Sequence, residues 1–332
     1  MNKTKVAILG MGNMGRNHLN ELRKFEDVEI VSLCSVPREA AEEYNAANGT
    51  NYPIYTDFDQ MLAEREIDAL FVCLPPFAHD GQIEKAAQKG IHIFTEKPLA
   101  LNLERGESMA KAVAQSGVFS QMGYHMRFGK AVRHVRRLME SGIAGKATLF
   151  SANYECNDLH VSWWRDRTKS GGQIFEQIIH LYDMAYFMMG KVDLVTGFIA
   201  NVCHQDVPGY TVEDTSAVSL RFRNGTVGCI TASNNAIPGR WVGIIKIVFE
   251  NMVVEFFDHN NCRITYTREG NRVEEISGED NSRYDEDRYF IDVVQGKEKP
   301  FATIAEGLDD LKIVSGACYS SEHEGTPVHI AD

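Results

Sequence analysis

Two parts of this sequence place titratable side chains where they could act on a bound molecule. Lys97 follows Glu96 and precedes Pro98, at the end of a short apolar segment. His180 follows Glu176 by four residues, so both project from the same face if this stretch is helical. An ammonium group can hydrogen-bond a substrate oxygen, and an imidazole can exchange a proton near neutral pH. These residue types indicate proton transfer at a substrate oxygen; the alternative is an exposed lysine and a structural Glu–His hydrogen bond.

The segment around His180 is predicted to be one helix that starts behind a pair of glycines. Gly171 and Gly172 provide a flexible start, and apolar residues beside His180 bury the rest of the helix. Asp183 follows His180 by three residues and should share the face of Glu176 and His180. No third ligand is evident near that pair, so no metal site is expected.

A glycine pattern near the N-terminus is typical of a dinucleotide site. Gly10, Gly12 and Gly15 form the pattern GxGxxG, directly after an apolar strand pattern and at the start of a helix pattern. The first glycine permits a tight turn, the second lets the backbone approach a pyrophosphate, and the third lets the helix pack on the strand. The helix start at Asn13 and Met14 would hold the phosphates. A glycine-rich turn without a ligand is the alternative interpretation.

The end of the second predicted strand bears on the choice of cofactor. NAD-selective sites place a carboxylate there, about 20 residues after the glycines. Ser35 stands near this position instead, so no charge repels a 2′-phosphate, and Arg38 is within reach to pair with one. The expected cofactor is NADP or NAD, with NADP preferred, unless Arg38 is simply exposed at a helix start.

The elements that must position these residues alternate over the first 120 residues, which predicts a parallel sheet covered by helices. Strand patterns span 5–9, 29–34, 69–74, 92–95 and 118–122, and helix patterns span 14–24, 37–48, 78–89 and 102–117. The glycine pattern and Lys97 both follow strand patterns, and open α/β sheets bind ligands at the carboxyl ends of their strands.

After Gly123 the pattern changes to that of an antiparallel sheet. Apolar and polar residues alternate over 218–223, and Asn224-Gly225 predicts a type I′ hairpin turn. Further strands are predicted at 147–155, 194–202, 243–249, 253–257 and 263–267, with late helices at 284–294 and after the capping box that Thr303 and Glu306 form. We expect an α/β protein of two domains, residues 1–123 and 124–332, with the last helix packing back on the first domain.

Composition limits the classes of partner. With 34 Lys plus Arg against 46 Asp plus Glu, the 332-residue chain has a net charge of −12, which repels nucleic acids and anionic membranes at long range. No apolar run approaches the roughly 18 residues that cross a bilayer. Seven cysteines form no CxxC pair, as suits a reducing compartment. The protein is therefore expected in the cytoplasm, with neither nucleic acid nor membrane as a partner.

Four motifs occur in an order and spacing that resemble the Gfo/Idh/MocA family of glucose-fructose oxidoreductases, inositol dehydrogenases and their relatives. They are the GMGNMG turn, Leu74-Pro75-Pro76 with His79, Glu96-Lys97-Pro98-Leu99-Ala100, and the block from Gly171-Gly172 through His180 to Asp183. The resemblance covers essentially the whole chain, and the joint occurrence of the last two motifs is specific.

The resemblance implies a doubly wound Rossmann domain that contains the cofactor site, followed by an α/β domain with a large open, mainly antiparallel sheet. In that family the exposed face of the sheet commonly mediates homodimers or homotetramers. It also implies hydride transfer at a secondary hydroxyl of a sugar, cyclitol or related polyol. Leu74, Pro75, His79 and Glu96 are then expected beside the cofactor.

By the same analogy, Lys97 positions the reacting hydroxyl, His180 is the acid/base, and the carboxylate four residues before it supports it. This sequence has Glu176 where the family has the shorter Asp, so Glu176 either reaches the hydroxyl or only orients His180. The family's usual acidic residue after the second strand is also missing at Ser35.

Further substrate contacts are expected from Arg127, Trp163, Trp164 and Arg165, since indole faces suit the C–H side of sugar rings and arginine suits hydroxyl or carboxylate groups. Alternatively, one tryptophan belongs to the core and Arg165 pairs with Asp166 or Glu176. Two rival functions remain open: an NAD-dependent glycoside hydrolase of the same architecture, and a non-catalytic NAD(P)-sensing regulator.

Overall fold

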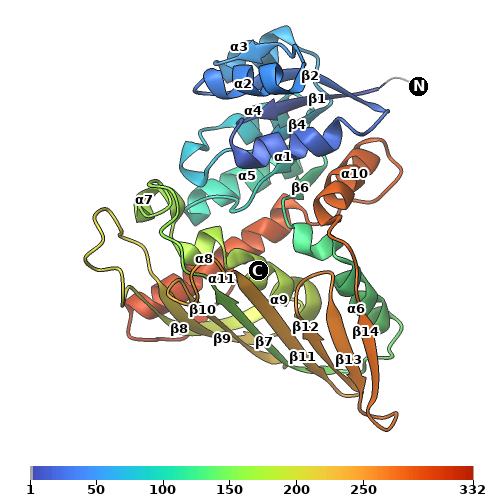
Figure 1. Ribbon diagram of the computed structural model, residues 1–332, viewed down its shortest axis with the longest axis vertical. Helices are drawn as coiled ribbons and strands as arrows, with labels where there is room; N and C mark the ends of the chain where they lie inside the picture. The colour runs from blue at the N-terminus through green and yellow to red at the C-terminus, as the bar shows by residue number, and fades with distance from the viewer. Residues whose placement is uncertain (1–2, 332) are drawn as a thin grey trace. The chain divides into compact units, whose positions relative to one another are not determined.

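The computed structural model describes residues 3–331, which divide into two compact units (Figure 1). The first unit comprises the chain up to Tyr124 together with Arg283–Leu308, and the second comprises His125–Ser282 and the chain from Asp309. The sequence analysis expected the division at residue 123 and the return of the last helix. The segment assigned to the first unit contains nearly all of the helix before the last and only the start of the last helix, up to Leu308; the rest of the last helix belongs to the second unit.

The first unit contains a six-stranded sheet in the order β3-β2-β1-β4-β5-β6, in which every neighbouring pair is parallel. Reversal of the strand order at β1 and β4 makes this a doubly wound sheet, as predicted. Its strands are β1 (Thr4–Leu9), β2 (Val28–Cys34), β3 (Ile54–Tyr55), β4 (Ala69–Val72), β5 (His92–Thr95) and β6 (Ser120–Met122).

Helices cover both faces of this sheet, which explains why its central strands β1 and β4 are mostly apolar. One buried cluster joins the sheet to α3 (Phe58–Glu64), α4 (Gln82–Gln88) and α5 (Leu103–Ser116). The other joins it to α1 (Asn13–Leu22), α2 (Glu39–Asn48) and α10 (Ser282–Val294). Asn102 caps α5, because its side chain accepts from Arg105 N. The short pair β3 and α3 lacks a recognisable pattern and was not predicted.

The second unit is built on a nine-stranded sheet in the order β14-β13-β12-β11-β7-β10-β9-β8-β15. Neighbouring strands are antiparallel except β7 and β10, so the prediction of a large, mainly antiparallel sheet is confirmed. The strands are β7 (Ala147–Glu155), β8 (Val192–Ala200), β9 (Thr215–Phe222), β10 (Val227–Ser233), β11 (Val242–Phe249), β12 (Met252–Phe256), β13 (Cys262–Tyr266), β14 (Arg272–Ile276) and β15 (Val328–His329).

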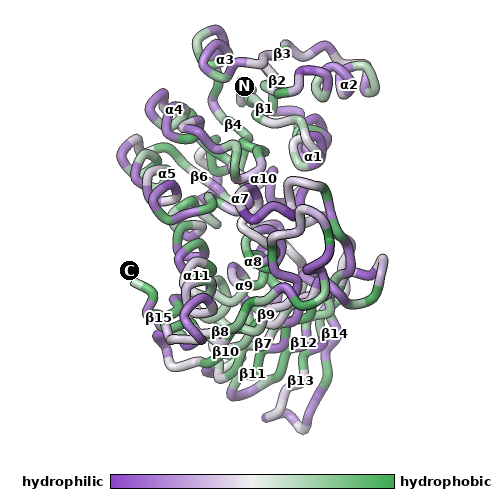
Figure 2. Tube along the Cα trace, turned by 90° about the vertical axis from the view of Figure 1, so that its left-hand side faces the viewer, coloured by the Kyte–Doolittle hydropathy of each residue, from purple (hydrophilic) through white to green (hydrophobic). Residues whose placement is uncertain are grey.

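The helices of this unit gather on one face of the sheet, and the other face carries none (Figures 1 and 2). They include α6 (Lys130–Glu140), α7 (Arg167–Ser170), α8 (Gln173–Glu176), α9 (Ile179–Met189) and α11 (Ile304–Glu322), the last shared with the first unit. Along β9 and β10 buried residues alternate with exposed or half-buried ones, which is the pattern of a sheet with one covered face.

The predicted type I′ turn after β9 is wrong. Of its two central residues only Gly225 has a positive φ, +88°, whereas type I′ needs both. Gly225 N donates to Phe222 O at 2.9 Å, and Phe222 N donates to Thr226 O at 2.9 Å. These bonds describe a three-residue loop with a left-handed glycine, the next most common hairpin connection. The capping box at Thr303 and Glu306 is present, with Thr303 N donating to Glu306 Oε2 at 2.7 Å.

Candidate functional site

The glycine turn of the first unit is shaped by two close approaches and one open space. A Cβ on Gly10, whose φ is +95°, would lie 2.5 Å from the Cys73 carbonyl oxygen, and a Cβ on Gly15 would overlap the Gly10 carbonyl oxygen. A Cβ on Gly12 would meet nothing within 4 Å. Gly10 and Gly15 are therefore required by the turn itself, while Gly12 leaves room beside the backbone, as the approach of a pyrophosphate requires.

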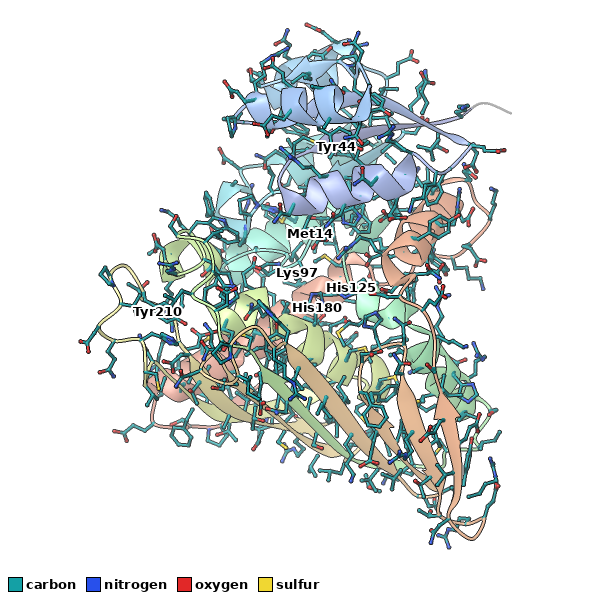
Figure 3. All side chains as sticks on the ribbon, viewed as in Figure 1. Met14, Tyr44, Lys97, His125, His180 and Tyr210 are labelled. Atoms are coloured by element: carbon teal, nitrogen blue, oxygen red, sulfur yellow. The ribbon has the colours of Figure 1, made fainter. Side chains whose placement is uncertain are left out.

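The N-terminus of α1 adds the electrostatic component of this site. Gly12 precedes the helix without a side-chain capping hydrogen bond, so its first N–H groups remain available for an anion. Asn13 is exposed, and Met14 is half-buried against the core of the first unit (Figure 3). The turn and helix together fit the phosphates of a dinucleotide.

The residues at the end of β2 are held by local hydrogen bonds. Ser35 is buried and its hydroxyl donates to Pro37 O at 3.0 Å. The Arg38 guanidinium donates to Glu42 Oε1 at 2.7 Å and to Ile54 O at 3.0 Å. Both residues lie next to the strand end, and the carboxylate expected of an NAD-selective site is absent from it.

The segment that directly follows β4 packs beside the glycine turn. Leu74 lies close enough that its Cδ2 would be 3.3 Å from a Cβ on Gly10. Pro75 follows and precedes the 3₁₀ turn Pro76–Ala78. His79 is buried, and this desolvation lowers its pKa to about 4, so its ring is neutral at physiological pH.

Glu96 and Lys97 directly follow β5. Glu96 is 6% exposed, and its Oε2 accepts the backbone N–H of Lys97 at 3.1 Å. Lys97 itself is half-buried and joined to Pro98 by a cis peptide bond. The sequence prediction that Lys97 stands at the carboxyl end of a parallel strand is therefore correct, and it belongs to the first unit.

His180 belongs to the second unit, but the predicted continuous helix around it is wrong. Helix α8 ends at Glu176, and α9 begins at Ile179 after a break at Gln177 and Ile178. At this break Ile178 N donates to Gln173 O at 3.0 Å, five residues back, which rotates the following turn. Glu176 and His180 therefore lie on different helices, and helical spacing does not place them on one face.

The pair of glycines before α8 is fixed in place rather than flexible. Gly172 has a φ of +106°, and a Cβ on it would overlap the carboxylate of Glu213. Glu213 is 1% exposed, accepts Ile174 N at 2.7 Å and pairs with Arg167 at 3.0 Å. This carboxylate thus satisfies an N–H at the start of α8 from a distant part of the chain, which sets the position of the helix that carries Glu176.

Three histidines follow one another in the second unit. The rings of His125 and His180, both labelled in Figure 3, meet edge to face with centroids 4.9 Å apart. The centroids of the His125 and His259 rings are 5.3 Å apart. His259 Nε2 lies 3.1 Å from Asp280 Oδ1 and 3.0 Å from Ser282 Oγ. Sequence reasoning missed His125 and His259, although a histidine within the Tyr124-His125-Met126-Arg127 segment was a usable signal.

Arg127 lies in the interior rather than in the expected contact with substrate. It is 1% exposed, and its Nη2 donates to Asp183 Oδ1 at 2.6 Å while Nε donates to both carboxylate oxygens. Asp183 is fully buried in α9, so it does not join His180 on a solvent-facing surface. The ion pair ties the segment before α6 to α9.

The tryptophan and arginine candidates mostly serve the loop that precedes α7. Trp164 is 4% exposed and packs with Tyr210 and Val212, and Trp163 lies partly buried against them. Arg165 donates to the carbonyl oxygens of Leu159 at 2.6 Å and His160 at 2.7 Å. The alternative that one tryptophan is core is therefore correct, and the alternative partners Asp166 and Glu176 are replaced by backbone carbonyls.

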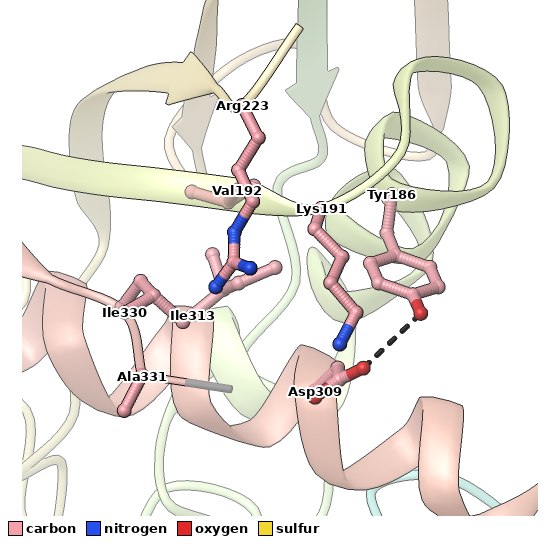
Figure 4. A pocket seen from close by; sticks show the side chains of 8 residues that line it. All are labelled: Tyr186, Lys191, Val192, Arg223, Asp309, Ile313, Ile330 and Ala331. Atoms are coloured by element: carbon pink, nitrogen blue, oxygen red, sulfur yellow. Dashed lines mark hydrogen bonds between the residues drawn. The ribbon is translucent and has the colours of Figure 1, made fainter.

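The second unit has a cavity of about 630 Å³ at the end of β11 and β12. Its wall combines aromatic and polar side chains: Tyr154, Trp241, Phe257, Arg240, Asp258 and His259, with Met126, Val242, Gly243 and Ile244. A smaller cavity of about 10 Å³ lies where Tyr186 donates to Asp309 at 3.1 Å (Figure 4). Only the larger one falls in the size range of ligand pockets, about 300–1,000 Å³.

Comparison with known proteins identifies the family. A sequence profile described as an oxidoreductase family with an NAD-binding Rossmann fold matches residues 4–124. A second profile, described as a GFO/IDH/MocA C-terminal domain, matches residues 132–257, so that together they cover more than half of the chain. The chain belongs to the GFO/IDH/MocA family.

Relatives within the GFO/IDH/MocA family differ in what they act on. The scyllo-inositol 2-dehydrogenase (NAD(+)) of Bacillus subtilis is 25% identical over 99% of this chain and 96% of its own length. The 2,7-anhydro-N-acetylneuraminate hydratase of Mediterraneibacter gnavus is 27% identical over 67% of this chain but only 59% of its own length. A levoglucosan dehydrogenase in complex with NADH and levoglucosan has the same fold, with a TM-score of 0.90 at 19% identity over 99% of this chain and all of its own.

As a member of the GFO/IDH/MocA family, the protein is an NAD-binding oxidoreductase.

Sequence reasoning did not select His18 and Asp287, two buried charged residues of the first unit that contact each other. The signal for His18 was a histidine three residues after Gly15, on the buried side of α1.

Among residues 3–331 no helix is long and apolar enough to cross a membrane, and no three metal-ligating side chains are grouped to hold an ion.

Proposed function

We propose that the protein transfers hydride between nicotinamide and a secondary hydroxyl or ketone of a sugar, cyclitol or related polyol. The observation that carries the proposal is that the His125 ring contacts both the His180 ring and the His259 ring. Because His259 lines the large cavity of the second unit, these contacts connect His180 to that cavity. An acid/base group that adjoins a ligand-sized cavity is the arrangement that alcohol oxidation needs.

The chain's own residues have distinct tasks in this proposal. His180 removes the hydroxyl proton of the substrate, and Lys97 donates a hydrogen bond to the alkoxide that develops. Glu176, at the end of α8, orients His180 or contributes its negative charge near the reacting hydroxyl. The bound nicotinamide supplies the acceptor for the carbinol hydride. Positioned proton transfer of this kind is worth roughly 10² to 10⁴ in rate.

The walls of the large cavity support a carbohydrate as its ligand. Tyr154, Trp241 and Phe257 offer aromatic faces for C–H groups, and the rings of Tyr154 and Trp241 meet edge to face at 6.5 Å. Arg240 and Asp258 offer a donor and an acceptor for hydroxyl groups. Relatives act on inositol and bind levoglucosan, which are polyhydroxylated rings of this kind.

NADP is the proposed preferred cofactor, with NAD as the second choice. The absence of a carboxylate at Ser35 removes the group that would repel a 2′-phosphate. Arg38 pairs with Glu42 in an exposed i,i+4 contact, with side chains 48% and 53% exposed. Such pairs are worth about 0.3–0.5 kcal/mol, so the guanidinium can exchange Glu42 for a phosphate at little cost. Both cofactors are tested below.

We also propose a homodimer or homotetramer that forms through the sheet face that carries no helix. That face exposes apolar residues on neighbouring strands, including Leu149 on β7 and Val227 on β10, which are register partners.

A cytoplasmic location is part of the proposal because none of the seven cysteines forms a disulfide.

One experiment tests the proposed function against its rivals. The purified protein is incubated with NADP or NAD and a panel of polyols, then with aryl glycosides and anhydro sugars. Net growth of absorbance at 340 nm supports the dehydrogenase. Release of aglycone from an aryl glycoside, or hydration of an anhydro sugar without net change in absorbance, would replace the dehydrogenase proposal by a reaction with transient oxidation. The related hydratase is the reason for including anhydro sugars. Cofactor binding without any turnover would replace it by a regulator.

A further inference from the structure

A buried histidine bridges two carboxylates in the first unit. His18 is fully buried; its Nδ1 lies 2.7 Å from Asp287 Oδ1 and its Nε2 lies 3.0 Å from Glu96 Oε1. An ionised carboxylate can only accept a hydrogen bond, so both ring nitrogens must carry a proton to satisfy these contacts. With Glu96 and Asp287 both ionised, the ring is an imidazolium flanked by two carboxylates in the interior.

The surroundings of this ion group favour the same charge state. Burial alone lowers the pKa of His18, but Asp287 and Glu96 outweigh it and raise that pKa to about 10. The ring also packs against Phe71 and Phe94, with centroids 5.7 and 4.8 Å away.

Other titratable groups around the ion group include Glu286, Arg283 and Cys73. Burial raises the pKa of Glu286 well above its usual value. Burial also raises the pKa of Cys73. The Arg283 guanidinium acts on both Glu286 and Asp287, where it lowers their pKa values.

The carboxylate of Glu96 connects this ion group to Lys97. One oxygen of Glu96 faces His18 and the other accepts the Lys97 N–H at 3.1 Å. On a third side Gly123 closes the space, because a Cβ there would lie 2.9 Å from the Glu96 carboxyl carbon. The backbone at Lys97 is therefore fixed by a carboxylate that is itself fixed by His18 and by the close approach of Gly123.

We propose that His18 is a positioning residue for Lys97: its imidazolium, anchored by Asp287 on α10, holds the Glu96 carboxylate that orients the Lys97 backbone. The inference rests on the proposed function, since it assigns Lys97 to the reacting hydroxyl. It gives a role in the reaction to the segment Arg283–Leu308, which returns to the first unit late in the chain.

The physical reason is the repulsion between the two carboxylates. Without the imidazolium, Glu96 and Asp287 would face each other in a buried site, and one of them would take up a proton. A protonated Glu96 is a weaker acceptor for the Lys97 N–H and can rotate. A misplacement of about 1 Å at a catalytic group can reduce turnover by 10²-fold.

The first test compares His18→Gln with the double variant His18→Gln/Asp287→Asn. We expect kcat of His18→Gln to fall by about 10- to 100-fold, with the Kd of the cofactor within about twofold of the wild type. The loss should be larger at low pH and smaller at high pH, because rising pH returns the charge to a carboxyl group that has taken up a proton. The double variant should recover part of kcat at neutral pH, because removing Asp287 lets Glu96 ionise.

A second variant and a control separate positioning from folding. Gly123→Ala displaces the Glu96 carboxylate without changing any charge, and should lower kcat with no new pH dependence. His92→Gln alters another histidine of the same unit, half-buried on β5, whose Nδ1 accepts Phe119 N at 3.0 Å. It should leave kcat within about twofold of the wild type. Thermal unfolding of each variant shows how much of any effect is structural.

The charge of His18 can be measured without any substrate. In ¹⁵N spectra of the histidine rings, assigned with His18→Gln, the His18 resonances should remain those of the cation from pH 6 to at least 9. A ring that becomes neutral below pH 8, a double variant no more active than His18→Gln, or a His18→Gln variant with unchanged kcat would each overturn the inference. If the wild type oxidises no polyol while His18 stays cationic, the proposed function fails and the ion group stands.

Discussion

At the scale of single residues, the site consists of side chains whose surroundings fix their charge and place. Glu96 holds the Lys97 backbone, His79 is kept neutral by burial, and His125 contacts the ring of His180. A buried carboxylate, Asp183, neutralises Arg127. Lys97 and His180 remain the groups that we assign to the chemistry.

Replacing Lys97 or His180 by Ala should lower kcat by about 10² to 10⁴ while the cofactor still binds, because each change removes help given only to the reacting hydroxyl. Steady-state rates and cofactor titration check this expectation. Lys111→Ala, an exposed lysine of α5, is the matched control and should leave kcat unchanged. Near-normal turnover in either active-site variant would show that its assignment is wrong.

Replacing Arg127 by Met should destabilise the second unit by about 3–5 kcal/mol, because it leaves Asp183 as an unpaired buried charge. The urea midpoint measures this loss. Arg221→Met removes a pair with Asp193 whose side chains are 49% and 34% exposed, so it should cost about 0–1 kcal/mol. If Arg127→Met were as stable as Arg221→Met, the buried ion pair would have no structural role.

At the scale of elements, the first half of the fold follows from the sequence and the site of the second half does not. The strand ends that carry Gly10, Ser35 and Lys97 were predicted because apolar runs stop there at glycine, serine or charged residues. The break between α8 and α9 was not, because Gln177 and Ile178 are compatible with a helix. The position of the α8 start depends on a distant carboxylate, Glu213. The burial of Arg127 likewise depends on a partner 56 residues away.

Gly172 tests this element-level argument. Gly172→Ala should destabilise the protein, because it adds strain at a φ of +106° and a clash with Glu213, and it should lower kcat by displacing α8. Gly49→Ala, at a φ of +61° with open space around it, carries strain of about 1–2 kcal/mol without a clash. Thermal unfolding and kcat are measured for both variants. If Gly172→Ala and Gly49→Ala change both quantities equally, Glu213 does not set the position of α8.

At the scale of the whole molecule, the sheet face that no described helix covers exposes apolar side chains (Figure 1). Leu149 is 39% exposed and Val227 is 51% exposed, side by side on β7 and β10. Charges introduced there should oppose the burial of this face between subunits, because an unpaired interfacial charge costs several kcal/mol.

Light scattering on Leu149→Glu/Val227→Glu should therefore give the mass of a monomer, where the wild type gives a dimer or tetramer. Ile143→Glu changes an exposed apolar residue in the turn after α6, outside the sheet, and should keep the wild-type mass. A double variant with the wild-type mass would exclude this face as the interface.

The central claim is that Lys97 and His180 serve the same hydroxyl, and a crystal structure with cofactor and a polyol that the protein oxidises tests it most directly. The account predicts the Lys97 Nζ and a His180 ring nitrogen each within about 3 Å of one substrate oxygen, with the carbinol carbon facing the nicotinamide. A bound and reactive polyol whose oxidised carbon lies next to only one of these two residues would contradict it.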